Sequence, residues 1–127
     1  MKIDFCKTTG KFLGFIDGKL ITKSKSKKRV ERICREHNVE DVVHFAAYKA
    51  VGESMEKPDE YQEVNYTATV ELLEAAKRHG VTRFIFSSTA AVYGSPDSMD
   101  PCREDGPTAP ISPYGSSKLM AESKVTE

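Results

Sequence analysis

Three consecutive segments decide the fold: VVHFAA at residues 42–47, YTATVELLEAAKRHG at 66–80 and RFIFSS at 83–88. The first and third are short apolar runs rich in β-branched and aromatic residues, which predict strands buried on both faces of a sheet. From Asn65 onward, Val70, Leu73 and Ala76 recur at helical spacing, and Gly80 closes that helix. A strand, a helix and a strand of these lengths predict a right-handed βαβ unit in a parallel sheet, and so an α/β domain.

The residues before this unit predict a helix and a hairpin. Val30, Ile33 and Cys34 share helical spacing in KKRVERICREHN, and Asn38 offers a C-terminal stop. Further upstream, FLGFI and KLIT flank Asp17-Gly18, a pair that supplies the positive φ angles of a type I′ turn.

The residues after the unit predict a loop and a final helix. Residues 94–113 hold five of the six prolines, so we expect no regular structure there. Ser112 and Pro113 then have the residue types of an N-cap and a first helical position.

Composition narrows the class of protein. The chain has 127 residues, 39% hydrophobic and 30% charged, which suits one small globular domain. It has no apolar run of transmembrane length, and its first residues, MKIDFCKTTGK, lack the apolar core of a secretion signal. Its three cysteines, Cys6, Cys34 and Cys102, have neither disulfide-framework nor zinc spacing. We therefore expect a cytoplasmic protein without a membrane partner or a bound metal.

The net charge of zero hides an asymmetry. Residues 1–35 carry eleven Lys and Arg against three Asp and Glu, whereas residues 36–127 carry eight against sixteen. A basic segment can bind nucleic acid, but the run from Lys23 to Arg29 has serines between its lysines and no aromatic residue. The favoured interpretation is a flexible, solvated connecting segment, and we expect no nucleic-acid partner.

Tyr114 and Lys118 are the first candidates for chemistry. They lie four apart at the start of the last predicted helix and so share one face. A nearby ammonium stabilises a phenolate, so such a tyrosine can act as general base toward a sugar or alcohol hydroxyl. Taken alone, the spacing also occurs by chance in partly exposed helix pairs.

Two strand ends supply further candidates. Ser87, Ser88 and Thr89 place three hydroxyls after the second strand, where open α/β sheets bind ligands. After the first strand come the small residues Ala46 and Ala47, then Lys49, which could reach a ribose or phosphate. Turn-capping hydroxyls and ordinary loop residues remain equally good explanations of these two patterns.

Taken together, VVHFAAYKAVGESMEKPDEY, RFIFSSTAAVYG and SPYGSSKLMAE resemble the UDP-glucose 4-epimerases of the extended short-chain dehydrogenase/reductase superfamily. The resemblance covers residues 28–124, and its most specific part is the KAVGES box. It implies a partial Rossmann-like parallel sheet with flanking helices. It also implies an isomerase of galactose and nucleotide-sugar metabolism, which interconverts UDP-glucose and UDP-galactose through a transient NAD-dependent 4-keto sugar.

The resemblance also implies roles for individual residues. Tyr114 would take the proton of the sugar 4-hydroxyl, Lys118 would bind the nicotinamide ribose and lower the tyrosine pKa, and Thr89 would bridge sugar and tyrosine. The role of Asn65 would be as much structural as cofactor-binding. The full set of residues that would contact NAD is Phe45, Ala46, Ala47, Lys49, Asn65, Ser87, Tyr114 and Lys118. The partners would be a UDP-sugar and, in a full-length form, a second copy of the chain.

The N-terminal part departs from this family. Gly10, Gly14 and Gly18 lie four apart and do not reproduce the Thr-Gly-x-x-Gly-x-x-Gly loop that seats the pyrophosphate. We therefore expect a divergent segment at residues 1–27 and a partial NAD-binding domain at 28–127. The first strands would be missing or replaced, and the C-terminal substrate domain would be absent. The chain by itself is expected to be inactive.

Two other interpretations remain open. The first is a non-catalytic remnant or binding module. The second is another NAD-dependent sugar-nucleotide enzyme, such as a UDP-glucuronate epimerase or a 4,6-dehydratase. Dehydratases usually carry an acidic residue after the hydroxyl cluster, where this chain has Ala90-Ala91.

Overall fold

Two parallel strands, β4 (Asp41–His44) and β5 (Arg83–Phe86), pair along their whole length, with Asp41 opposite Arg83 and His44 opposite Phe86. Helix α4 (Ala68–Arg78) lies between them in sequence. The predicted α/β fold with a βαβ unit is confirmed. Both strands are shorter than predicted, because strand pairing stops at His44 and Phe86. One residue after β5, the Ser87 N–H still donates a hydrogen bond to the His44 carbonyl at 3.1 Å.

The computed structural model describes residues 2–8, 11–16, 19–24, 27–95 and 101–127. It divides into two compact units that alternate along the chain. The first unit is Met1–Ala47 with Ala68–Ser87, and the second is Tyr48–Thr67 with Ser88–Glu127.

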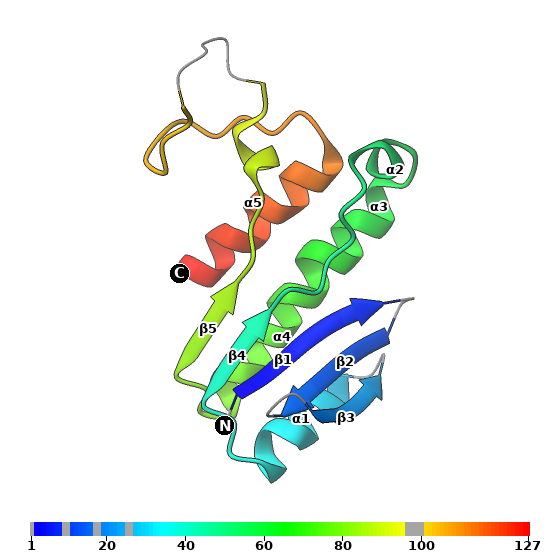
Figure 1. Ribbon diagram of the computed structural model, residues 1–127, viewed down its shortest axis with the longest axis vertical. Coiled ribbons are helices and arrows are strands. Elements are labelled where there is room, and N and C mark those ends of the chain that lie inside the picture. The colour runs from blue at the N-terminus through cyan, green and yellow to red at the C-terminus, as the bar shows by residue number, and fades with distance from the viewer. Residues whose placement is uncertain (1, 9–10, 17–18, 25–26, 96–100) are drawn as a thin grey trace. The chain divides into compact units, whose positions relative to one another are not determined.

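The sheet of the first unit has the strand order β3-β2-β1-β4-β5. Strand β1 (Lys2–Thr8) runs parallel beside β4, and β2 (Lys11–Ile16) and β3 (Lys19–Ser24) continue the sheet antiparallel (Figure 1). Ile16 faces Lys19, so β2 and β3 form a hairpin where the sequence predicts one, although its turn at 17–18 lies outside the described residues. This antiparallel meander stands where a dinucleotide-binding fold would continue with parallel strands.

Helices α1 (Lys27–Glu36) and α4 contribute to the core of the first unit together with β4. Its buried apolar side chains are Ile33, Cys34, Val39, Val42, Leu72 and Ala76. Both helices end as predicted, because Asn38 and Gly80 adopt the positive φ angles of 47° and 76° that turn the chain out of a helix.

Strand β5 corrects one expectation. The sequence predicts burial on both faces, but Arg83 and Ile85 are exposed, Ile85 to 55%. The reason is the position of β5 at the edge of the sheet, where Ile85 has a neighbouring strand on one side only, whereas its partner Val43 on β4 is buried.

The second unit is built mainly of short helices. After α2 (Val51–Glu56) come α3 (Pro58–Tyr61) and a π-helical turn, η1 (Gln62–Thr67), which leads into α4. The helix that the sequence predicts from Asn65 therefore begins in a π-helical turn. The unit closes with a 3₁₀ turn, η2 (Ala90–Tyr93), and helix α5 (Pro113–Thr126) (Figure 1); residues 101–112, which precede α5, form no helix or strand.

Gly94 ends η2 at a place where a side chain does not fit. Its φ is +71°, and a Cβ atom there would lie 1.9 Å from the Ala109 carbonyl oxygen. We expect Gly94→Ala to lower the free energy of unfolding by roughly 2–4 kcal/mol, because both the backbone conformation and the clash oppose it. Urea denaturation followed by circular dichroism measures the change.

Gly52 is the matched control for this substitution. It lies in α2 with nothing within 4 Å of its Cβ position, so Gly52→Ala is expected to be neutral or stabilising. Equal effects of the two substitutions would contradict the packing of η2 against the segment that contains Ala109.

Candidate active site

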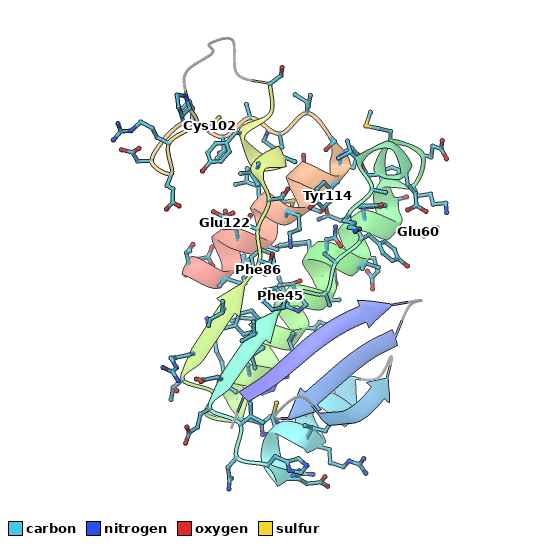
Figure 2. The ribbon with its side chains drawn as sticks, viewed as in Figure 1. Phe45, Glu60, Phe86, Cys102, Tyr114 and Glu122 are labelled. Carbon is cyan, nitrogen blue, oxygen red and sulfur yellow. The ribbon has the colours of Figure 1, made fainter. Side chains whose placement is uncertain are left out.

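Helix α5 carries the Tyr-Lys pair, and its start is fixed as predicted. The Ser112 hydroxyl accepts a hydrogen bond from the Gly115 N–H at 3.1 Å, and Pro113 occupies the first turn. Because the helix starts there, Tyr114, Lys118 and Glu122 follow one another at intervals of four residues along one face. Figure 2 shows Tyr114 near the beginning of α5 and Glu122 near its end.

Lys118 is buried although it carries an ammonium group. Its side chain is only 3% exposed. Burial lowers the pKa of Lys118 to about 8, and the negative charge of Glu122 opposes this shift. An ammonium that titrates near neutral pH is unusual in a structural lysine and common in active sites.

Thr89 lies in the same unit, at the start of η2. Its hydroxyl oxygen accepts the Ala91 N–H at 3.2 Å, so the threonine caps the turn. Turn and helix pack closely: a Cβ at Gly115 would lie 2.7 Å from the Ala91 carbonyl oxygen. The three predicted catalytic residues, Tyr114, Lys118 and Thr89, thus belong to elements of the second unit that pack on one another.

Asn65 joins the segment after β4 to α5. Its side-chain oxygen accepts the Tyr48 N–H at 2.8 Å, and its amide nitrogen donates to the Tyr48 carbonyl at 2.9 Å and to the Ser117 hydroxyl at 3.3 Å. Both amide protons are used within the chain, and the side chain is 1% exposed. This geometry favours the structural side of the role expected for Asn65.

A second tyrosine, Tyr61, lies beside Tyr114 but has a different environment. The two rings meet edge to face, with centroids 6.4 Å apart. The Tyr61 hydroxyl donates to Glu53 at 3.0 Å and accepts the Ala50 N–H at 3.1 Å. Burial and the hydrogen bond to Glu53 raise the pKa of Tyr61. The Tyr61 hydroxyl therefore remains protonated, and its ring packs beside Tyr114. In the described part of the chain, the Tyr114 hydroxyl makes no such hydrogen bonds.

The remaining predicted cofactor residues lie elsewhere. Phe45, Ala46 and Ala47 follow β4, and Ser87 follows β5, all in the first unit. Figure 2 shows Phe45 and Phe86 at the carboxyl ends of these adjacent strands. Phe45 is 61% exposed, which leaves an aromatic face available to a flat ligand. Lys49 is exposed and belongs to the second unit.

The sequence analysis did not identify two residues that contact the predicted site, Glu122 and Tyr61. Glu122 could have been found from its spacing of four from Lys118, and Tyr61 from its place just after the Pro58 helix start. Among the residues that the structure describes, no three His, Cys, Asp or Glu side chains gather as a metal site would need. Nor is any described helix long and apolar enough to cross a membrane.

Comparison with known proteins identifies the family. Residues 20–127 match the family described as GDP-mannose 4,6 dehydratase, and the chain belongs to it. The predicted similarity to UDP-glucose 4-epimerases is confirmed: the enzyme of Azospirillum brasilense is 50% identical over 97 residues, which are 76% of this chain and 28% of that protein.

Solved structures agree with this assignment. A UDP-glucose 4-epimerase of Bifidobacterium longum in complex with NAD+ and UDP is 44% identical, with a TM-score of 0.74 over 80% of this chain and 30% of that one. The enzyme of Thermotoga maritima with UDP-glucose is 32% identical, with a TM-score of 0.78 over 88% of this chain and 37% of that one. The chain spans 28–37% of the length of these relatives.

The described residues include donor groups that could hold the ribose and sugar end of NAD. An ammonium and two hydroxyls, from Lys118, Tyr114 and Thr89, are the donors that a ribose diol and a sugar hydroxyl require. In dinucleotide-binding folds the pyrophosphate lies at the N-terminus of a helix that begins just after the first strand. Here Thr8 of β1 pairs with Lys11 of β2, so β1 leads into an antiparallel strand instead of a helix.

The lowered pKa of Lys118 also leads to a prediction about stability. Its folded-state pKa of about 8 lies below its ordinary value of 10.5, so the folded chain releases the proton at lower pH than the unfolded chain. Between these values the unfolded state binds more protons, and stability rises with pH. Relative to Lys118→Met, the wild type is expected to gain on the order of 3 kcal/mol between pH 7 and 10.5.

Denaturant titrations of both chains across this pH range measure the gain. Lys77→Met, which removes an exposed lysine of α4, is the matched control and is expected to follow the wild type. Parallel curves for wild type and Lys118→Met would show that Lys118 is not buried as an ammonium.

Proposed function

We propose that this chain carries the acid–base part of a UDP-glucose 4-epimerase site. One observation carries the proposal: Tyr114 and the buried Lys118 share a face of α5, and the turn capped by Thr89 packs on the first turn of that helix. The epimerase relatives support the choice of UDP-glucose and UDP-galactose as substrates. The proposed setting is galactose metabolism in the cytoplasm, with a homodimer as the full-length form.

The chemistry follows from these groups. Bound NAD would supply reversible hydride acceptance at C4 of the sugar. The Tyr114 oxygen takes the proton of the 4-hydroxyl as hydride leaves C4 and the C4 carbonyl forms. The Lys118 ammonium stabilises the phenolate and binds ribose hydroxyls, and Thr89 orients the sugar hydroxyl. Tyr114 would give the proton back to the oxygen on C4 once hydride has been returned to the opposite face of that carbon, so the epimer would form with no net redox change.

A dehydratase function is less well supported. Eliminating the hydroxyl that lies β to a 4-keto group needs an acid that protonates the leaving group. The two residues after Thr89 are Ala90 and Ala91, which have no proton to give. The epimerase reaction needs no such acid.

The proposal treats residues 28–127 as the NAD-binding part and 1–27 as divergent. Phe45, Ala46, Ala47, Lys49 and Ser87 would contact the nicotinamide half of the dinucleotide. Because β1 leads into a hairpin, binding of the adenosine half is expected to be weak or absent. The isolated chain is therefore expected to bind NAD weakly and not to turn over UDP-galactose.

Nicotinamide mononucleotide tests this proposal. If only the nicotinamide half of the site is present, this probe and NAD should bind within about five-fold of each other, a difference of about 1 kcal/mol. Titrations followed by NMR on the labelled chain should shift the signals of Thr89, Tyr114 and Lys118 with both probes. Lys118→Ala should weaken both, whereas Lys77→Ala on α4 should weaken neither.

Two results would overturn the proposal. NAD binding a hundred-fold tighter than the mononucleotide would mean that the N-terminal strands have rebuilt an adenosine site. The absence of shifts at Thr89, Tyr114 and Lys118 with either probe would favour a non-catalytic remnant. A coupled assay for UDP-glucose formed from UDP-galactose provides the second readout, and turnover by the chain alone would contradict the expected inactivity.

A further inference from the structure

Glu122 contacts the turn that carries Thr89. The Ser88 hydroxyl donates a hydrogen bond to Oε2 of Glu122, between residues 34 apart in the sequence. Ser88 and Glu122 are both half-buried. A hydrogen bond to a carboxylate in such a setting is stronger than one between neutral groups. It ties the residue before Thr89 to the third turn of α5.

The same carboxylate lies one helical turn from Lys118. Spacing of four residues brings the two side chains to the same face of α5, and the negative charge of Glu122 acts on the buried ammonium. Five other carboxylates lie on the elements packed against α5, and all are exposed: Glu53, Glu56, Asp59, Glu60 and Glu63. Glu53 is engaged by Lys57 at 3.2 Å and by Tyr61. Glu122 therefore combines partial burial, a hydrogen bond from Ser88 and a negative charge one helical turn from Lys118.

The turn is held at two ends. Beyond Thr89, the Ala109 N–H donates to the Val92 carbonyl at 3.0 Å, and Gly115 allows close approach of Ala91 to α5. Before Thr89, the bond from Ser88 to Glu122 is the corresponding connection. Without it the Thr89 end of the turn would be anchored to α5 from one side only.

We propose that Glu122 is a positioning residue of the Tyr114–Lys118–Thr89 site, which fixes the Ser88–Thr89 segment on α5 through Ser88 and keeps a negative charge beside Lys118. This inference rests on the proposed function for its purpose, but the hydrogen bond of Glu122 with Ser88 and its effect on Lys118 are testable without any ligand. The residue acts through Ser88 and Lys118 and does not itself touch the substrate.

Amide hydrogen exchange in the full chain tests the first contact. In Ser88→Ala and in Glu122→Ala, the amides of Ala91 and Val92, which bond to Thr89, should exchange about ten-fold faster or more. Glu122→Gln keeps an oxygen that can accept from Ser88 and should restore most of the protection. Glu63→Gln, an exposed carboxylate of η1, is the matched control and should change nothing.

The NMR titration of the Lys118 side chain tests the second contact. Glu122→Gln should lower the Lys118 midpoint, because the stabilising charge is lost while the hydrogen bond remains. Ser88→Ala should change this midpoint less, because the charge remains. A merely structural role of Glu122 would not separate the two variants in this way.

The proposal fails if Glu122→Ala leaves exchange at Ala91 and Val92 unchanged, or speeds exchange equally along all of α5. It also fails if Glu122→Gln leaves the Lys118 midpoint unchanged. These outcomes are independent of the proposed function, which fails separately if wild-type chain shows no mononucleotide binding at Thr89, Tyr114 and Lys118.

Discussion

The side-chain amide of Asn65 is the interaction on which the site depends. Its three hydrogen bonds join the backbone of Tyr48 to Ser117 on α5, and they do so from inside a π-helical turn. Tyr61, four residues earlier, packs its ring against both Tyr48 and Tyr114. A buried amide with unfilled hydrogen bonds would cost several kcal/mol, so these contacts permit one arrangement of the segment and the helix. The Tyr114–Lys118 face of α5 is thereby held in place.

The two units of the chain retain different features of the family. The first unit retains the parallel β4–β5 pair of the family but builds its other edge from an antiparallel meander. The second unit retains the Tyr-Lys helix and the hydroxyl turn. A general base for a sugar hydroxyl would come from the second unit, whereas dinucleotide-binding folds seat the pyrophosphate at a helix N-terminus after the first strand. Family membership and catalytic competence of this chain are therefore separate questions.

Local patterns in the sequence predicted the elements well. The strand at Val42, the cap at Ser112-Pro113 and the helix ends at Asn38 and Gly80 each depend on neighbouring residues, and each prediction is confirmed. The exposure of Ile85 was predicted wrongly, because the position of a strand in its sheet is not a local property. The Asn65–Ser117 and Ser88–Glu122 bonds span 52 and 34 residues, so no spacing rule could have indicated them.

The side-chain amide signals of Asn65 in the ¹⁵N-labelled chain report directly on the bridge between Tyr48 and Ser117. If the amide bridges Tyr48 and Ser117, its two protons should have distinct, downfield chemical shifts and should exchange slowly with solvent. Nuclear Overhauser effects should connect them to Ser117. Signals at the positions of an unstructured asparagine, exchanging rapidly, would show that the bridge from Tyr48 to Ser117 on α5 does not form.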